Sequence, residues 1–327
     1  MYQLLPASSP ALPDASSHQL SASQFEMLRE VPAEGLWFAN LTSPQTRRAY
    51  QADLREFRSF VGIVQPVELR SVTRAHVLAW RAVLERRGLS GATIRRKLAA
   101  LGSLFDYLCE NNAVNSNPVD GVRRPRVDCS EGKTPGLSGK QARQLLNAPS
   151  VDTLKGLRDR AMLSTLLFHA LRRDELASLR VKDFKQIRSG VPHLLVHGKG
   201  QKIRFIPVHP DSLHLITQYL MSAGHAEEAE GALFRSLRPH KKHHSASGLS
   251  PGAIYTLVLG YLEQIGIKGE NMGPHSLRVT AATSALQNNT DIGRVQQWLG
   301  HASISTTKMY DRRNQQPQDS PTYRVQY

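Results

Sequence analysis

The chain has 327 residues, of which 40% are hydrophobic and 21% charged, a composition typical of soluble globular proteins and a length sufficient for two domains. Lysine and arginine number 42 against 27 aspartates and glutamates, and the resulting net charge of +15 favours a polyanionic partner such as nucleic acid. Only two cysteines occur, and no apolar run reaches the length of a membrane span, which excludes a disulfide framework and predicts a cytoplasmic protein with no membrane partner.

The first half of the chain predicts a flexible extension followed by a helical domain. Residues 1–40 are expected to be mostly flexible, because they begin with a stretch rich in Ser, Pro and Ala that lacks the features of a signal peptide. Apolar residues then recur at helical spacing in "SPQTRRAYQADLREFRSFVG", "VTRAHVLAWRAVLERRG" and "SGATIRRKLAALGSLFDYLCE". With a short fourth helix expected near 115–122, residues 41–122 are predicted to form a small helical bundle.

A polar, proline-bearing stretch at 123–136 is interpreted as a linker to a second domain at 137–313. In this domain two β runs, 194–196 and 203–208, flank a turn that contains Gly-Lys-Gly. Helices are expected near 209–222, 251–265, 274–288 and 291–299. The tail, residues 314–327, is expected to dock on a neighbouring protomer.

Two stretches early in the second domain hold residues that suit chemistry on an anion. In "FHALRRDELASLRVKDF", Arg172 and Glu175 lie one helical turn apart, and taken alone they form an ordinary ion pair. In "GKGQK", Lys199 occupies a hairpin tip, where a lysine is usually just solvated, and the spacing is not that of a P-loop. Neither stretch is decisive by itself.

Two further stretches lie closer to the C-terminus. "GPHSLRVTAATSAL" places His275 and Arg278 on one face near the start of a helix, where an anion is favoured. "QWLGHASISTTKMY" places His301 just after a helix end, with Tyr310 at the close of a short polar segment. Read alone, Tyr310 either covers a core edge with its ring or presents its phenol to a substrate.

In this order, Arg-x-x-Glu, a Gly-Lys-Gly hairpin, His-x-x-Arg, Leu-Gly-His and Tyr resemble the tyrosine recombinases, also called the phage integrase family, over roughly residues 41–312. "SPQTRRAYQADLREF" and "GATIRRKLAAL" are similar to the core-binding domain of that family. The resemblance implies a mainly α protein, with an N-terminal SAM-like four-helix core-binding domain and an α+β catalytic domain that has a small antiparallel β-sheet. A short N-terminal extension and no large insertion before "GPHSLR" favour Xer-type or transposon-encoded site-specific recombinases.

The family chemistry agrees with the residue types. Cleaving a phosphodiester without a metal requires a nucleophile, cations for the non-bridging oxygens and an acid for the leaving oxygen. The resemblance implies that Tyr310 attacks the phosphorus and forms a 3′-phosphotyrosine, with no cofactor and no ATP. The other implied roles are phosphate binding by Arg172 and Arg278, protonation of the leaving oxygen by Lys199, hydrogen bonding to phosphate and phenol by His275 and His301, and orientation of these groups by Glu175.

Two positions depart from the family pattern without removing a functional group. Ala170 replaces the glycine common before Leu-Arg, and Arg173 replaces the usual apolar residue after the arginine. No metal site is expected, since the histidine-rich "RPHKKHH" at 238–244 has no carboxylate or cysteine companion and is interpreted as a basic loop.

The partner implied is double-stranded DNA carrying recombination sites, with a homotetramer assembled on two paired sites. Basic residues expected to contact the DNA backbone lie at helix starts of the first domain and in the linker. They are Arg47, Arg48, Arg95, Arg96, Lys97, Arg123, Arg124 and Arg126. The target sequence, the choice between integration, excision and resolution, and any accessory protein are not written in the chain.

Two other functions remain open at this point. A type IB topoisomerase shares the phosphotyrosine chemistry but reseals the same strand, and the core-binding resemblance favours a recombinase. A DNA-binding protein that has lost catalysis has no need of Tyr310. Tyr323 and Tyr327 are weaker candidates for the nucleophile, because no Leu-Gly-His precedes them and they follow Pro317 and Pro321.

Overall fold

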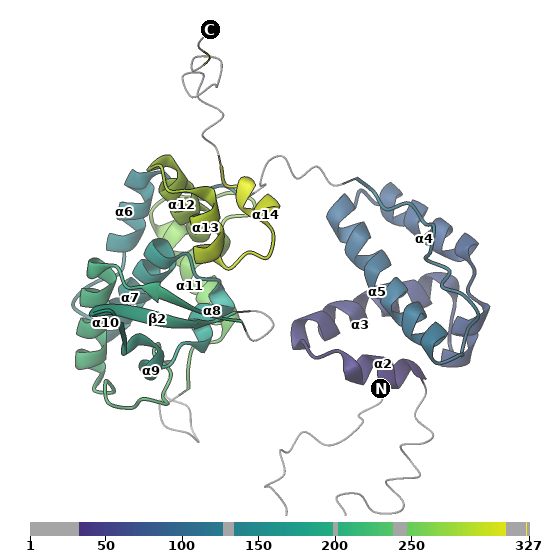
Figure 1. Ribbon diagram of the computed structural model, residues 1–327, viewed down its shortest axis with the longest axis horizontal. Coiled ribbons are helices and arrows are strands. Elements are labelled where there is room, and N and C mark those ends of the chain that lie inside the picture. The colour runs from purple at the N-terminus through teal and green to yellow at the C-terminus, as the bar shows by residue number, and fades with distance from the viewer. Residues whose placement is uncertain (1–32, 127–133, 199–201, 238–246, 312–324, 326–327) are drawn as a thin grey trace, which may run out of the picture. The chain divides into compact units, whose positions relative to one another are not determined.

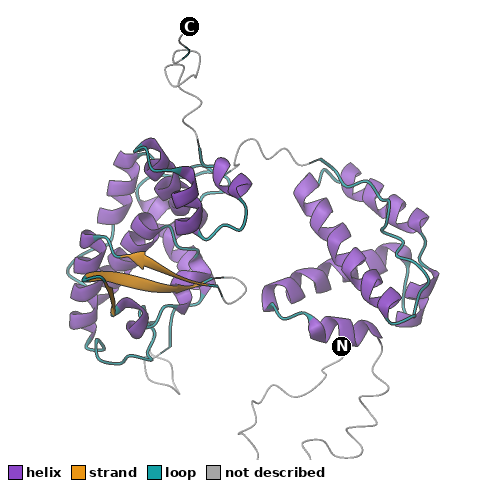
Figure 2. Ribbon diagram, viewed as in Figure 1, coloured by secondary structure: helices purple, strands orange, loops and turns teal. Residues whose placement is uncertain are grey.

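A computed structural model describes residues 33–126, 134–198, 202–237, 247–311 and 325. The chain divides into two compact units, Met1–Asp128 and Cys129–Tyr327 (Figure 1). Each has its own hydrophobic core. Helices dominate both, and a small antiparallel sheet belongs to the C-terminal unit, so the predicted fold class is confirmed (Figure 2). Of the tail at 314–327, only Val325 is among the described residues.

The N-terminal unit is built around its longest helix, α5. Ser43 begins α3 as predicted, its Oγ accepting a hydrogen bond from the Thr46 N–H at 3.3 Å, and Gly62 ends it with φ 77°. Leu98, Leu101 and other apolar residues of α5 are fully buried against the remaining helices. The elements are α2 (Ala33–Asn40), α3 (Pro44–Val61), the 3₁₀ turn η1 (Pro66–Ser71), α4 (Arg74–Arg86) and α5 (Gly91–Glu110).

Helix α2 lies at the end of residues 1–40, the stretch that the sequence predicted to be mostly flexible, and residues 1–32 lie outside the described residues. Trp37 holds this helix on the bundle, with only 4% of the residue exposed. Its ring stacks on Tyr50 with a centroid distance of 6.0 Å, and its Nε1 donates to Ser103 Oγ at 3.2 Å. A helix of eight residues shows too little periodicity to be predicted, and here the buried ring of Trp37 anchors it.

The prediction of a helix near 115–122 is wrong, because this segment forms turns. Asn117 explains the difference. Its side-chain amide donates to Gly102 O at 3.2 Å and to Asp106 Oδ1 at 2.7 Å, and its Oδ1 accepts from the Val119 N–H at 2.9 Å. Asparagine side chains that bond to the backbone in this way favour turns, and the following Pro118 disfavours helical geometry at Asn117.

The C-terminal unit is centred on α7, which packs against α10 and α12 and buries side chains on all its faces. The predicted helices from residue 209 onward are confirmed with boundaries within two residues. None of the described helices is long and apolar enough to cross a bilayer. The helices are α6 (Gly139–Asn147), α7 (Leu154–His169), α8 (Arg173–Ser178), α9 (Val181–Phe184), α10 (Pro210–Ala223), α11 (Pro251–Gln264), α12 (Pro274–Gln287), α13 (Ile292–Leu299) and α14 (Ile304–Lys308).

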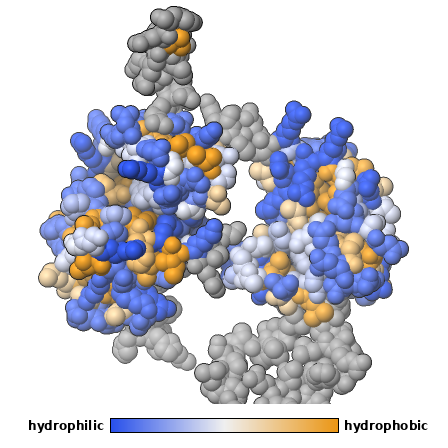
Figure 3. Space-filling model, viewed as in Figure 1, coloured by the Kyte–Doolittle hydropathy of each residue, from blue (hydrophilic) through white to orange (hydrophobic). Residues whose placement is uncertain are grey.

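The sheet has the antiparallel order β1-β2-β3, with β1 at Gln186–Arg188, β2 at Val191–His197 and β3 at Ile203–Pro207. Leu194 and Ile206 pair across β2 and β3 and are buried. Ile203 and Phe205 alternate with them and are 58% and 39% exposed, so hydrophobic surface lies over the sheet (Figure 3). Burial of one face fixes the register, and it directs Arg204, the partner of Val196, inward.

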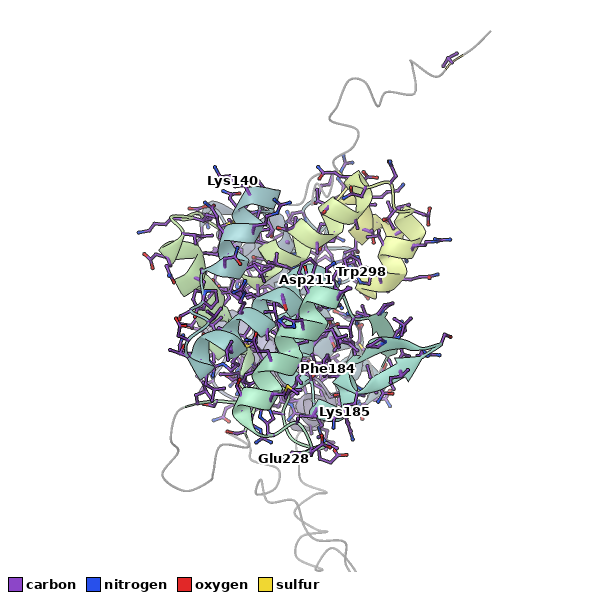
Figure 4. All side chains as sticks on the ribbon, turned by 90° about the vertical axis from the view of Figure 1, so that its left-hand side faces the viewer. Lys140, Phe184, Lys185, Asp211, Glu228 and Trp298 are labelled. Atoms are coloured by element: carbon purple, nitrogen blue, oxygen red, sulfur yellow. The ribbon has the colours of Figure 1, made fainter. Side chains whose placement is uncertain are left out.

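The C-terminal helices enclose a second, smaller cluster of buried side chains. Val279 and Leu286 of α12, Leu299 of α13 and Tyr310 meet Ala170 there. Trp298, labelled in Figure 4, lies where these helices meet the rest of the unit and packs against both clusters. The position of α13 is therefore tied to the main core.

His169, at the end of α7, makes the stability of the C-terminal unit depend on pH. It is 1% exposed, with Nδ1 bonded to Thr165 O at 3.2 Å and Nε2 accepting from the His209 N–H at 3.0 Å. Burial lowers the pKa of His169 to about 4, against the opposing effect of the hydrogen bond to Thr165. In the unfolded chain His169 takes up a proton near pH 6.5, whereas in the folded chain it does so only near pH 4. The contribution of neutral His169 to stability is therefore complete above pH 6.5 and is lost as the pH falls towards 4.

We therefore expect the free energy of unfolding to fall between about pH 6.5 and about pH 4, with His169 contributing on the order of 3 kcal/mol of the change. Urea titrations at several pH values measure it. His169→Gln keeps a donor and an acceptor but does not titrate, so its curve should be flatter than that of the parent. Parallel curves for the two proteins would contradict the prediction.

Candidate functional site

Arg172 and Glu175 meet at the start of α8. Arg172 is the residue before the helix, and Glu175 lies in its first turn. Arg172 Nη1 donates to Glu175 Oε1 at 2.8 Å, and the Arg172 backbone N–H donates to Oε2 at 2.8 Å. The Glu175 side chain is 4% exposed and that of Arg172 is 38% exposed. The ion pair allowed by the sequence is present, and it leaves part of the guanidinium accessible.

A left-handed residue, Ala170, turns the chain from α7 into this pair. It has φ 50° and ψ 35°, is fully buried, and its carbonyl oxygen accepts a hydrogen bond from Arg278 Nη1. The left-handed conformation costs a residue with a Cβ atom about 1–2 kcal/mol, whereas glycine adopts it without this cost. In this chain the burial of the Ala170 methyl group offsets part of that cost.

We expect Ala170→Gly to leave the free energy of unfolding within about 1 kcal/mol of the parent, because relieved strain and lost methyl burial are of similar size. Ala170→Val should destabilise the protein by about 2–4 kcal/mol, since a β-branched side chain suits neither the backbone nor the filled cluster. Urea titration gives both values. Equal stability of the two variants would argue against the left-handed turn.

Arg278 lies on the first turns of α12 and is 2% exposed. Its Nη2 donates to Leu299 O at 2.6 Å and lies 3.0 Å from His301 Nε2, while Nη1 bonds to Ala170 O. Burial and the charge of Arg172 lower the pKa of Arg278 to about 10. The guanidinium therefore stays charged at neutral pH, and it joins the ends of α7 and α13 at one point.

His301 follows the left-handed Gly300, which ends α13 with φ 64°. Because a guanidinium can only donate, His301 Nε2 is the acceptor from Arg278, and Nδ1 is left to donate to Thr307 Oγ1 at 3.0 Å. Burial, then the charges of Arg278 and Arg172, lower the pKa of His301 to about 4. His301 is thus a neutral imidazole held between α12 and α14.

Tyr310 lies just beyond α14 and is 4% exposed, with its ring in the smaller buried cluster. Its hydroxyl lies 3.4 Å from His275 Nε2, and its backbone oxygen accepts from Thr283 Oγ1 at 3.3 Å. Burial, then the charges of Arg278 and Arg172, lower the pKa of His275 below its usual value. The ring covers the core, which is the first alternative raised by the sequence, and the phenol faces a neutral histidine.

A cleft of about 370 Å³ opens beside these groups. Arg172, His275 and Arg278 line it, together with Arg173 and Tyr255, whose guanidinium and ring lie 5.8 Å apart. Arginine guanidiniums bind phosphate oxygens through charge-assisted hydrogen bonds, often in pairs. A neutral His275 next to a phenol is able to accept its proton. His275 therefore links the side chains that line this cleft to the buried phenol of Tyr310.

Lys199 lies outside the described residues, which resume at Lys202 after Gly198. The hairpin that carries it is present, with the Gly198 N–H donating to Lys202 O at 2.7 Å. Sequence reasoning missed Arg204 on β3, which donates to both carboxylate oxygens of Glu175. The sequence feature that could have revealed Arg204 is its inward position in a strand whose other inward residues are apolar.

The basic residues singled out in the N-terminal unit differ in their surroundings. Lys97 is 7% exposed and donates to Asp53 and Glu56, and Arg96 also pairs with Asp53. Arg47 donates to the carbonyl oxygens of residues 39 and 41. These contacts hold the three side chains within the bundle, but Arg96 keeps an exposed surface. The exposed members are Arg48, Arg95, Arg96, Arg123, Arg124 and Arg126.

Within the described ranges, no group of three or more His, Cys, Asp and Glu side chains is placed to hold a metal ion. The histidine-rich run at 238–244, interpreted above as a basic loop, lies outside those ranges.

Comparison with known proteins adds two family matches. Residues 136–316 match the phage integrase family, and residues 33–112 match the phage integrase N-terminal SAM-like domain. The second match begins at the first residue of α2.

Individual relatives cover most of the chain. A tyrosine recombinase of Pseudothermotoga lettingae is 33% identical over 272 residues, which span 82% of this chain and 87% of the relative. Tyrosine recombinase XerD of Listeria monocytogenes is 30% identical over 272 residues, spanning 82% and 88%. The crystal structure of XerH site-specific recombinase in a post-cleavage complex with palindromic difH substrate has a TM-score of 0.66 at 21% identity, covering 93% of this chain and 84% of that one. At that identity the likeness to XerH shows the fold alone.

Proposed function

Because the chain belongs to the phage integrase family, we propose that it is a site-specific DNA recombinase that cleaves and rejoins strands through a 3′-phosphotyrosine intermediate. The observation that carries the proposal is the place of Tyr310. Its hydroxyl lies 3.4 Å from Nε2 of His275, and His275 lines the cleft together with Arg172 and Arg278.

In this proposal the scissile phosphate occupies the cleft, where Arg172 and Arg278 neutralise its non-bridging oxygens. Tyr310 Oη attacks the phosphorus, the phenol proton passes to His275 Nε2, and the bond from phosphorus to the 5′ oxygen breaks. The leaving oxygen takes its proton from Lys199, the role implied by the family resemblance. The new ester conserves the bond energy, so a 5′ hydroxyl of another strand can reverse the step without ATP.

His301 and Glu175 have supporting roles in the proposal. The neutral His301 accepts from Arg278 and so keeps that guanidinium directed at the cleft. Glu175 holds Arg172 through both its side chain and its backbone N–H. Neither group needs to gain or lose a proton for the strand to be cut.

DNA contact by the N-terminal unit belongs to the same proposal. Arg48, Arg95 and the exposed arginines at 123, 124 and 126 bind phosphates, which makes affinity fall as salt rises. Lys97 is left out, since its ammonium is buried between two carboxylates. We place the reaction in the cytoplasm, on two paired sites held by a homotetramer.

The decisive experiment traps the covalent intermediate and identifies the target site at the same time. Duplexes with a randomised segment and a nick just 3′ of it are incubated with the protein, so that cleavage releases a short oligonucleotide and leaves the ester trapped. Adducts that resist SDS are isolated and their DNA is sequenced. A recombinase yields adducts enriched in one sequence, whereas a DNA-binding protein without catalysis yields none, which would refute the proposal.

The sequence recovered then separates recombinase from topoisomerase. Two labelled duplexes carrying it should exchange strands when mixed with the protein. Relaxation of supercoiled plasmid with no exchange between sites would favour a type IB topoisomerase instead.

A further inference from the structure

Arg204 occupies a position that no part of the reaction above has used. Its guanidinium meets Glu175 as a two-pronged pair, with Nη1 to Oε1 at 2.9 Å and Nη2 to Oε2 at 2.8 Å. Its Nε donates to Trp298 O, the carbonyl near the end of α13, at 3.1 Å. The side chain is 15% exposed. One planar group thus connects β3, α8 and α13.

The carboxylate of Glu175 is shared between Arg204 and Arg172. Each of its oxygens accepts one hydrogen bond from the Arg204 guanidinium and one from Arg172, the latter through Nη1 or through the backbone N–H. Four donors fix the carboxylate in its plane. Burial alone would raise the pKa of Glu175, but the hydrogen bonds and charge of Arg204, followed by those of Arg172, lower it. Without Arg204, the Glu175 carboxylate that holds Arg172 would lose two of its four hydrogen bonds.

Arg204 also lies against the base of the hairpin that carries Lys199. A Cβ atom added to Gly198 would stand 3.5 Å from Arg204 Nη1 and 3.2 Å from Lys202 O. Since Gly198 and Lys202 close the hairpin through a 2.7 Å hydrogen bond, the guanidinium packs directly on this closing pair.

The same guanidinium packs against the turn before His301. A Cβ atom added to Gly300 would stand 3.2 Å from Arg204 Nη1. The neighbouring carbonyl of Leu299 accepts from Arg278 at 2.6 Å and lies 3.5 Å from Arg172 Nη1. Three arginines from three elements therefore bind the last carbonyls of α13, where a helix end favours cations.

We propose that Arg204 is a positioning residue for strand cleavage, which sets Arg172 through Glu175 and joins the Lys199 hairpin to the turn that presents His301. The assignment rests on the proposed function. Lysine cannot replace it, because one ammonium does not reproduce the flat fork that reaches both carboxylate oxygens and Trp298 O together.

The test measures single-turnover cleavage of the nicked duplex by Arg204→Lys protein, with enough protein to bind all of the DNA. We expect the cleavage rate to fall about 10²-fold, as misplacement of catalytic groups by about 1 Å does. DNA affinity should stay within a few fold, because Arg204 is not a phosphate contact. Arg188→Lys is the matched control, an exposed arginine of the same sheet that lies over the Phe205 ring, and it should cleave as the parent does.

A double-mutant cycle separates positioning from a general loss of stability. If Arg204 acts through Glu175, Arg204→Lys combined with Glu175→Gln should cleave no more slowly than the slower single variant. Multiplied defects, or a rate that falls only in proportion to the unfolded fraction seen by circular dichroism, would overturn the proposal. Gly198→Ala would place a Cβ atom 3.2 Å from Lys202 O and so disturb the hairpin base on which the guanidinium packs. It should also slow cleavage, and it provides a second route if Arg204→Lys folds poorly.

The link to the hairpin has its own readout. A substrate with sulfur in place of the bridging 5′ oxygen needs no proton on its leaving group, so it bypasses the step assigned to Lys199. The Arg204→Lys defect should shrink on this substrate, and an undiminished defect would overturn the hairpin link. Absence of any adduct with the parent protein would instead refute the proposed function, so the two failures are distinguishable.

Discussion

Tyr310→Phe protein should form no covalent adduct with DNA, while it binds the same duplexes with unchanged affinity. The substitution removes only the hydroxyl, which lies 3.4 Å from His275 Nε2, and leaves the ring in its buried cluster. Loss of one long hydrogen bond changes the free energy of unfolding by about 1 kcal/mol or less, so the variant stays folded. Adduct formation is scored on denaturing gels and affinity by titration at fixed salt.

Tyr323→Phe and Tyr327→Phe serve as controls for this prediction, since they remove the two other tyrosines near the C-terminus. Both should form adducts at the parental rate. An adduct that survives Tyr310→Phe and disappears in one of these variants would transfer the nucleophile to the tail.

Arg278→Lys should lower the cleavage rate at least about 10²-fold, as loss of one preorganised donor to a developing charge does. A lysine keeps the charge, but its single ammonium cannot reach Ala170 O, Leu299 O and His301 Nε2 at once. The buried carbonyls left without a donor should reduce the free energy of unfolding by about 2–4 kcal/mol. Single-turnover cleavage and urea titration measure the two effects separately.

Arg294→Lys is the matched control, because Arg294 is exposed on the neighbouring α13. It should change neither the cleavage rate nor the stability. If Arg278→Lys cleaved as fast as the parent under conditions where both are folded, Arg278 would have no part in the transition state.

The buried charge of Arg278 supports the proposed action of this site on phosphate. Arg278 is 2% exposed, yet with a pKa of about 10 it remains protonated at neutral pH. Its attraction for an anion is strong because little water screens it. Burial also keeps His275 neutral, so the cleft combines permanent positive charge with a group able to accept a proton.

Local signals in the sequence predicted most helices. The helix expected at 251–265 is observed at Pro251–Gln264, because Ser250 caps it and proline opens it, both of which are local effects. Strand β1 has three residues and forms only because β2 lies beside it, so no local pattern marks it. Helix α2 depends in the same way on the stacking of Trp37 on Tyr50.

The DNA-contact candidates show the limit of composition as a guide. A run of three basic residues at 95–97 reads as one positive patch, but α5 turns Lys97 into the bundle while Arg95 stays exposed. Asp53 and Glu56 on α3 receive the buried ammonium. Which member of a basic run is neutralised depends on a partner helix far away in the chain.

The sequence by itself determined the family, the fold class and the order of the reactive residue types, because helical periodicity, caps and short motifs are properties of neighbouring residues. Only the tertiary structure decided how these residues converge. It brings Arg172 and Arg278 to one carbonyl, that of Leu299, and it brings Arg204 to the carboxylate that holds Arg172. Such contacts require donor and acceptor to lie within about 3 to 3.5 Å of each other. Between segments this far apart in the chain, these distances follow from the packing of α7, α12 and α13, which no local pattern contains.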